Sequence, residues 1–244
     1  MLYDLTFKRE NNMKLIELKS MHPDNEFAPS WNIPIHLSTW GDTEKINNIK
    51  NFLIDKESKV IQQFPTKQGS GTYGDGRTGL GLDSVTSKSG MYTIFDFNKE
   101  LSDFNDLLDF MRISYLNFLS EYKTGVRDSH IVCWFNVIRS EQSIDTHFHG
   151  TEHRCYLSGN MHLDNYPTTT NYYIPYDHTL IHKFPNTAGG LTMFPTYMPH
   201  GVDTYTGEDV RVSVAFDLHT QIPQELVSIP FINDEIFNRL TSSS

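Results

Sequence analysis

The second half of the chain is a series of short segments in which apolar and polar residues alternate. Successive side chains of a β-strand point to opposite faces, so a period of two indicates strands with one buried face. Turn sequences rich in Gly, Asn and Pro separate these segments, a pattern typical of a β-sandwich or barrel. The expected strands cover residues 130–139, 144–149, 155–163, 179–183, 190–194 and 210–218.

Two amphipathic helices are expected before these strands. The first follows Asp42, with Asp42 or Thr43 as its N-cap, and ends before Pro65. The second carries an apolar stripe over residues 101–122, and Gly125 is well placed to end it. The stripe of residues 101–122 is expected to pack on the outer face of the β core.

No linker separates the helices from the strands, so we expect one domain over residues 1–244. Residues 1–128 would supply N-terminal strands and the supporting helices. Residues 129–218 would form the β core, which also carries the candidate site described below. Residues 219–244 would be a C-terminal extension.

The composition of the chain argues against several classes of protein. A net charge of −10 disfavours a protein that holds duplex nucleic acid through its phosphates. No apolar stretch reaches the roughly 18 residues that a membrane helix needs, and the N-terminus lacks the pattern of a secretory signal. Cys133 and Cys155 form no CxxC motif; we expect both to be reduced, with a disulfide as the alternative. These features predict a soluble cytoplasmic protein.

A glycine-rich segment covers residues 69–81. It contains Gly69-Ser-Gly71-Thr-Tyr-Gly74, which matches the GxGxxG pattern of dinucleotide-binding folds. That pattern requires a strand before it and a helix after it, whereas here a helix precedes and more glycines follow. A surface loop is therefore the favoured interpretation, and a lid over a nearby site is the alternative.

Histidines are concentrated in the β half of the chain. Of the 11 in the sequence, eight lie between residues 130 and 200. His147 and His149 are two residues apart in an expected strand, so they share a face, together with Asp145. His200 follows an apolar strand and two prolines, where it can complete a metal site with this pair. An incidental cluster is the alternative for the other histidines.

The expected strand at residues 210–218 carries an arginine in apolar surroundings. Its valines and Phe216 share one face, so Arg211 and Ser213 lie together on the other. A buried arginine needs an anionic partner, because burying an unpaired charge is costly. A small dicarboxylate held by Arg211 and Ser213 would provide one. A salt bridge to a protein carboxylate is the alternative.

Taken in order, these residues resemble the Fe(II)/2-oxoglutarate-dependent oxygenases, especially a branch found in tailed phages and marine bacteria. The resemblance covers residues 129–218. The motifs that carry it are Trp134-Phe-Asn136, His147-Phe-His149, Ser158-Gly159, Gly190-Leu-Thr-Met-Phe-Pro195, His200 and Arg211-Val-Ser213.

The resemblance implies a mainly β fold with supporting helices, built on a double-stranded β-helix (a jelly-roll, cupin-like core). It implies Fe(II) held by His147, His149 and His200, and 2-oxoglutarate held by Arg211, Ser213 and Asn136. Dioxygen would be the second cosubstrate, and hydroxylation of a primary substrate the usual reaction. A phage-encoded protein would act in the cytoplasm of its host.

One departure from the family pattern leaves the ligand set open. Most of the superfamily binds iron through two histidines and a carboxylate, in the order H-x-D/E and a distal histidine. Here His149 stands at the carboxylate position. Either all three histidines bind the metal, or Asp145 or Glu152 supplies the carboxylate, or water fills the third position.

Two other functions are compatible with the sequence. A cupin-like metalloprotein would use the histidines without 2-oxoglutarate, and a jelly-roll virion or binding protein would use neither. The primary substrate and the oligomeric state cannot be predicted. Aromatic residues of a Tyr-rich segment either line a pocket or belong to a surface loop; these are Tyr172, Tyr173, Tyr176 and Tyr197.

Overall fold

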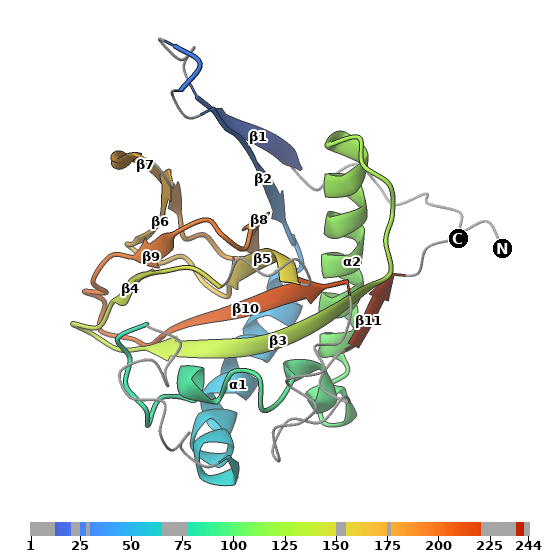
Figure 1. Ribbon diagram of the computed structural model, residues 1–244. Helices are drawn as coiled ribbons and strands as arrows, with labels where there is room; N and C mark the ends of the chain where they lie inside the picture. Colours follow the sequence, from blue (N-terminus) through green and yellow to red (C-terminus); the bar gives the residue numbers. More distant parts are fainter. Residues whose placement is uncertain are drawn as a thin grey trace, which may run out of the picture.

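Two antiparallel β-sheets form the centre of the molecule (Figure 1). The computed structural model describes residues 13–20, 25–27, 30–64, 78–149, 155–174, 177–220 and 238–241. A seven-stranded sheet has the order β1-β2-β8-β5-β10-β3-β11, and a four-stranded sheet has the order β4-β9-β6-β7. This confirms the expected mainly β fold with a jelly-roll core.

The seven-stranded sheet collects strands from the whole length of the chain. Its strands are β1 (Lys14–Lys19), β2 (Asn32–Thr39), β3 (Ser129–Ile138), β5 (Cys155–His162), β8 (Gly190–Pro195), β10 (Arg211–His219) and β11 (Asn238–Thr241). The strands of the smaller sheet are β4 (Ile144–His147), β6 (Thr169–Ile174), β7 (Asp177–Pro185) and β9 (His200–Val202). The N-terminal hairpin and β11 extend the same sheet that contains β3 and β10.

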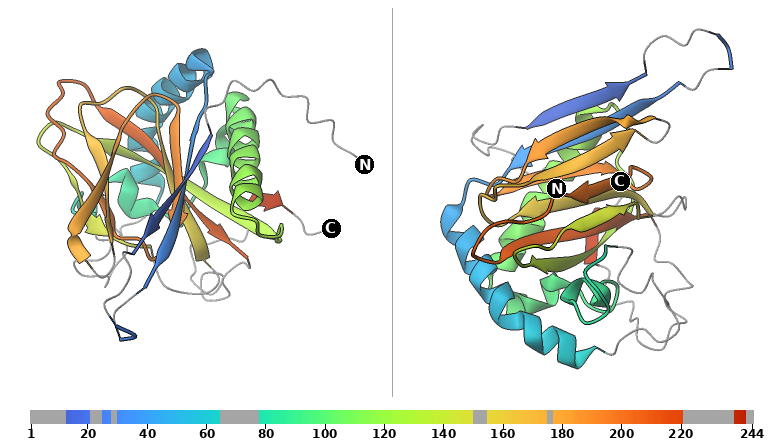
Figure 2. Two further views of the ribbon diagram at one scale, coloured as in Figure 1. Left: turned by 90° about the horizontal axis from the view of Figure 1, so that it is seen from above. Right: turned by 90° about the vertical axis from the view of Figure 1, so that its left-hand side faces the viewer.

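Two long helices pack on one face of the seven-stranded sheet (Figure 2). Helix α1 (Thr43–Gln63) begins at Asp42, whose side chain accepts a hydrogen bond from the backbone N–H of Lys45 at 3.2 Å. Helix α2 (Asp103–Glu121) buries one side against the core. Two short 3-10 helices, η2 (Val85–Lys88) and η3 (Ile94–Lys99), connect them. Among the described residues, neither helix has the length and apolar character needed to cross a membrane.

The end of α2 differs from the prediction. Lys123, not Gly125, adopts the left-handed conformation after the helix, with φ of 56°. The backbone N–H of Thr124 then donates to the carbonyl of Leu119 at 2.9 Å, which satisfies a carbonyl of the last turn. Glycine is preferred at such positions only because it has no Cβ, so another residue can take its place at a modest cost.

The alternation in β10 separates the two sides of the large sheet. Val212, Val214, Phe216 and Leu218 join the apolar core beneath the helices. Arg211, Ser213, Ala215 and Asp217 point the other way, into a cavity between the two sheets. The helices therefore cover one face of the seven-stranded sheet, and the opposite face lines the cavity.

Strand β6 was not predicted. Tyr172 belongs to it and is fully buried, so the interpretation of this segment as a surface loop is wrong for Tyr172. Its ring packs on Phe194 at a centroid distance of 4.9 Å. The strand has few exposed positions, because its polar residues are buried in hydrogen bonds, and it therefore lacks the alternation that marks the other strands.

Candidate functional site

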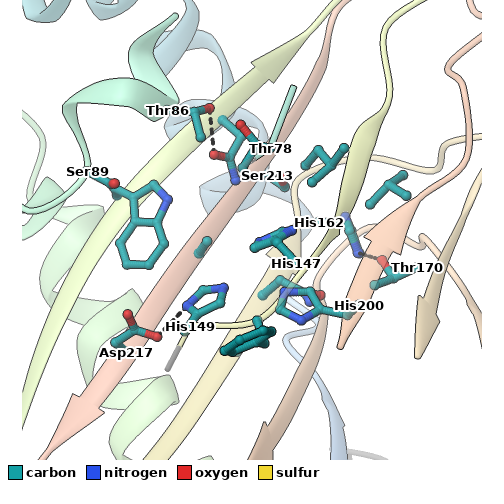
Figure 3. Close-up of a pocket in the computed structure, with 18 of the residues that line it drawn as sticks. Thr78, Thr86, Ser89, His147, His149, His162, Thr170, His200, Ser213 and Asp217 are labelled. Carbon is teal, nitrogen blue, oxygen red and sulfur yellow. Dashed lines mark hydrogen bonds and ion pairs between the residues drawn. The ribbon is translucent and has the colours of Figure 1, made fainter. Parts of the chain in front are cut away.

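A cavity of about 230 Å³ lies between the two sheets, and most of its polar lining comes from three places (Figure 3). The large sheet contributes Trp134, Asn136, Asn160, His162, Arg211, Ser213 and Asp217. The small sheet and the loop after β4 contribute His147, His149, Thr170 and His200. The segment around η2 contributes Thr78, Thr86 and Ser89.

Three imidazoles meet at one end of this cavity. His147 of β4 is paired with His200 of β9 across the small sheet, and His149 follows directly after β4. One ring nitrogen from each of the three lies within 4.8 Å of the others. The ring centroids of His147 and His200 are 4.5 Å apart, and those of His149 and His200 are 5.0 Å apart. Such a group has the donor number and spacing of a three-imidazole metal site.

Each of the three rings uses its Nδ1 atom in a hydrogen bond that leads away from the cluster. His147 donates to the carbonyl of Asp145 at 2.8 Å, and His200 donates to the carbonyl of Met198 at 3.0 Å. A carbonyl can only accept, so Nδ1 carries the proton and Nε2 keeps its lone pair. Hydrogen bonds of this kind fix the tautomer and the direction of metal-binding histidines.

His200 is held in its neutral form. Burial lowers its pKa well below the ordinary value of 6.5, and any charge on His147 or His149 lowers it further; the carbonyl of Met198 opposes this. Tyr172 stacks on the ring at a centroid distance of 6.0 Å, which fixes its plane. A neutral, buried and oriented imidazole has the form that binds a metal ion.

The third Nδ1 bond goes to a carboxylate that was not predicted as part of the site. His149 donates to Oδ1 of Asp217 at 2.7 Å, and Ser158 donates to the same oxygen at 2.6 Å. Burial alone would raise the pKa of the Asp217 carboxyl, but its interaction with His149 and the hydrogen bond from Ser158 outweigh burial, and this pKa is lowered. Asp217 is therefore an anion directly behind His149.

The alternative carboxylates are placed differently. Asp145 packs against the backbone of Gly79, where an added Cβ would lie 2.6 Å from Oδ2 of Asp145. The main-chain carbonyl of Asp145 accepts the hydrogen bond from His147, and its carboxylate does not belong to the three-imidazole group. Glu152 lies outside the described residues, as does most of the glycine-rich segment 69–81. Thr78, at the edge of that segment, lines the cavity.

Arg211 lies in the same cavity as the imidazoles. Only 1% of its surface is exposed, and burial lowers its pKa to about 10, so it remains charged at neutral pH. Nη2 donates to Nδ1 of His162 at 3.3 Å, and the guanidinium lies 5.7 Å from the ring of Tyr166. Among the described residues, Nε and Nη1 have no hydrogen-bond partner, and no carboxylate forms an ion pair with Arg211.

Polar groups on neighbouring strands surround the guanidinium. Ser213 is opposite Asn136 on β3 and opposite His162 on β5, so these three side chains form one row across the sheet. Asn136 donates to Oγ of Ser213 at 3.5 Å and accepts a hydrogen bond from Thr86 at 2.8 Å. The hydroxyl of Ser213 is left with its own proton to donate to an anion beside Arg211.

His162 is the second residue that was missed from the sequence. Burial lowers its pKa well below 6.5, and the charge of Arg211 lowers it further, so the ring is neutral. Because Nδ1 accepts from Arg211, Nε2 carries the proton, and it lies 3.4 Å from the hydroxyl of Thr170. Thr170 in turn donates to Asn186 at 2.8 Å. This chain of hydrogen bonds fixes the direction of the guanidinium.

The remaining residues singled out from the sequence lie outside the cavity or at its edge. Cys133 is buried in the core and is not joined to Cys155 in a disulfide. Cys155 belongs to a second group of metal-binding atom types with Asp217 and His219, all within 4.8 Å of one another. Tyr197 is 42% exposed and does not line the cavity.

No protein-family model and no curated protein sequence matches this chain. Among solved structures, a Pseudomonas putida prolyl-4-hydroxylase is similar, with 17% sequence identity and a TM-score of 0.40. The similarity covers 49% of this chain and 66% of the hydroxylase, which is just under two thirds of the length of the hydroxylase. The α-ketoglutarate-dependent epimerase SnoN of nogalamycin biosynthesis has 12% identity and a TM-score of 0.44 over 60% of this chain and 75% of its own. A 2OG-Fe(II) oxygenase family oxidoreductase from Burkholderia pseudomallei has 14% identity and a TM-score of 0.40 over 50% and 60%.

Proposed function

We propose that this protein is a Fe(II)- and 2-oxoglutarate-dependent dioxygenase that hydroxylates a primary substrate. The observation that carries the proposal is the position of Arg211. A buried guanidinium, two of whose nitrogens have no partner in the described part of the chain, lies in the same cavity as a cluster of three imidazoles. An uncompensated charge of this kind is costly in a folded protein. A ligand that has a carboxylate and also binds a metal would satisfy both features at once.

His147, His149 and His200 would hold the metal. Three imidazole nitrogens suit a divalent first-row transition ion, and three protein ligands leave coordination positions open for other molecules. Bound iron would supply the activation of dioxygen and the cleavage of the substrate C–H bond. The protein would hold the ligands in place through the Nδ1 hydrogen bonds.

Arg211 and Ser213 would hold the far carboxylate of 2-oxoglutarate. The planar guanidinium can donate two parallel hydrogen bonds to a carboxylate, which defines both its position and its plane. Asn136 would orient the hydroxyl of Ser213, and His162 would orient the guanidinium. With one carboxylate fixed in this way, the 2-oxo acid end of the molecule would extend toward the imidazoles that line the same cavity.

The overall reaction would convert 2-oxoglutarate, O₂ and R–H into succinate, CO₂ and R–OH. One oxygen atom of O₂ enters succinate and the other enters the hydroxyl group, and the oxidative decarboxylation supplies two of the four electrons that reduce O₂. The C–H bond of the substrate supplies the other two. No external reductant is needed for this balance.

A cupin-like metalloprotein without 2-oxoglutarate is the second candidate. The observation in its favour is that His149 takes the place of a carboxylate in the metal cluster. A cupin-like function without 2-oxoglutarate does not account for a buried arginine with two nitrogens unpaired among the described residues. We therefore place this function second.

The test is turnover of 2-oxoglutarate. The purified protein, given Fe(II), 2-oxoglutarate and O₂, should form succinate even without its primary substrate, at a low rate. Arg211→Ala should lose this activity, whereas Arg139→Ala is the matched control, because Arg139 is exposed and pairs with Glu57 on the surface. A metal-loaded protein that forms no succinate and does not bind 2-oxoglutarate would support the cupin-like function.

A further inference from the structure

The three-imidazole cluster would leave the charge of a bound divalent cation without a negatively charged ligand. Two histidines and a carboxylate would place one negative charge on a divalent cation, whereas three neutral imidazoles place none. Burial makes this difference matter, because His200 is only 6% exposed and charges are screened less in the interior. The buried environment should therefore provide an anion elsewhere.

We propose that Asp217 provides this anion from outside the coordination sphere and holds the metal centre through the ring of His149. This inference rests on the proposed metal site. Asp217 would be a positioning residue: its carboxylate accepts a hydrogen bond from Nδ1–H of His149 at 2.7 Å, which leaves Nε2 free to face the metal. The negative charge then makes the imidazole a stronger donor and offsets part of the cation's charge.

The surroundings of Asp217 are built to hold it in this position. Asp217 is opposite Ser158 in the pairing of β10 with β5, and the Ser158 hydroxyl donates to the same carboxylate oxygen at 2.6 Å. Figure 3 shows the carboxylate of Asp217 directed at the edge of the His149 ring. The indole of Trp134 lies near the same ring, at a centroid distance of 5.8 Å. His149 is therefore held by a carboxylate at its edge and by a neighbouring indole.

Asp217 is not placed to bind the same metal directly. Its Oδ1 contacts Nδ1 of His149, and the ring of His149 separates this atom from the nitrogens of His147 and His200. Asp217 also lies within 4.8 Å of Cys155 and His219. Direct binding of a second ion by these three residues is the competing role, and it predicts a different stoichiometry.

The test compares Asp217→Asn with Ser158→Ala in the metal-free full-length protein. The asparagine side chain keeps the size of the original one and an oxygen that accepts from His149, but it has no charge. Ser158→Ala removes a hydrogen bond to the carboxylate and keeps the charge. Calorimetric titration with Mn(II) should give about 10- to 100-fold weaker binding in Asp217→Asn. The loss in Ser158→Ala should stay below about fivefold, as expected for one hydrogen bond.

A second readout separates positioning from a purely structural role. The ligand-field absorption of bound Co(II) should shift in Asp217→Asn and stay unchanged in Ser158→Ala, because only the first changes the donor strength of His149. Unchanged Mn(II) affinity and an unchanged Co(II) spectrum in folded Asp217→Asn would overturn the proposal. Loss of one of two bound metal equivalents would also overturn it, since Asp217 would then be a direct ligand.

The wild-type titration separates failure of the proposed function from failure of the role of Asp217 alone. If the wild-type protein binds no metal, the proposed function and this inference both fail. If it binds one equivalent and Asp217→Asn binds equally well, only the role of Asp217 fails. If Asp217→Asn does not fold, Asp217→Glu takes its place, because glutamate keeps the charge and only displaces it. Asp217→Glu should fold and should weaken Mn(II) binding by a smaller factor than that expected for Asp217→Asn. An affinity equal to that of the wild type would contradict the proposal.

Discussion

Replacing Arg211 by methionine should affect binding and stability in opposite directions. Methionine is apolar and similar in length to the hydrocarbon stem of arginine, so it can fill much of the same space without a charge. In the metal-loaded protein it removes the proposed contact with the far carboxylate of 2-oxoglutarate. In the protein without ligand it removes a buried cation whose Nε and Nη1 have no partner among the residues that the structure describes.

The size of the binding effect follows from the number of bonds. Hydrogen bonds between charged groups contribute about 1.5–3 kcal/mol each, so loss of a two-bond contact costs roughly 3–6 kcal/mol. The dissociation constant for 2-oxoglutarate should therefore rise by a factor of about 100 or more. Arg211→Lys keeps the charge and loses the planar fork, and we expect it to weaken binding at least about tenfold.

The size of the stability effect follows from burial. The fall in the pKa of Arg211 to about 10 on burial corresponds to roughly 3 kcal/mol against the charged form in the folded state. Methionine recovers this energy, but it leaves Nδ1 of His162 without a donor, which costs about 1–3 kcal/mol. The ligand-free Arg211→Met protein should thus be as stable as the wild type, or up to about 2 kcal/mol more stable.

The assay is a calorimetric titration of the Mn(II)-loaded proteins with 2-oxoglutarate, together with urea unfolding of the ligand-free proteins. Arg139→Met is the matched control, because Arg139 is half exposed and pairs with Glu57 away from the cavity. An Arg211→Met protein that still binds 2-oxoglutarate with wild-type affinity would refute the reasoning. Strong destabilisation of the ligand-free protein would refute the claim that the guanidinium has no partner there.

Three further predictions concern the metal, the pH and the core. His200→Ala should abolish Mn(II) binding in calorimetry more completely than His149→Ala, because His200 is the more deeply buried and pairs directly with His147; equal loss would contradict this ranking. Burial holds the pKa of His162 well below 6.5 in the folded state, so the unfolded chain binds its proton first as the pH falls. Stability to urea in the ligand-free protein should therefore be full above about pH 6.5 and should fall below it, with a shallower fall in His162→Gln. Leu107→Ala should cost about 2–5 kcal/mol of unfolding free energy and leave the Mn(II) affinity of the folded protein unchanged, since Leu107 is fully buried in the core beneath the helices.

The sequence predicted those strands and helices that have one apolar, buried face and one polar face. Strand β10 has an apolar face against the helices and a polar face toward the cavity, so its alternation placed Arg211 and Ser213 together. The same alternation continues to Asp217, two residues beyond Ala215, and would have placed its carboxylate in the cavity. Helix α1 was predicted with Asp42 or Thr43 as its cap, and Asp42 is the cap, because a cap and an apolar stripe are both local signals.

Other parts depend on pairing between distant segments. His162 lies beside Arg211 only because β5 is paired with β10 in a register that no local pattern encodes. Strand β6 was missed because buried hydrogen bonds, such as that from Asn171 to Asp203 at 2.7 Å, replace apolar contacts along it. The contact of His149 with Asp217 joins residues 68 positions apart, and it became visible only in three dimensions.

The most direct test of the central claim is a titration in two steps, first with Mn(II) and then with 2-oxoglutarate, on the metal-free protein. The proposed site predicts one equivalent of Mn(II), followed by one equivalent of 2-oxoglutarate that binds tightly only after the metal is present. Loss of the second step in Arg211→Ala with the first step intact would place both ligands in the one cavity. Binding of the metal with no binding of 2-oxoglutarate to the wild-type protein would contradict the claim.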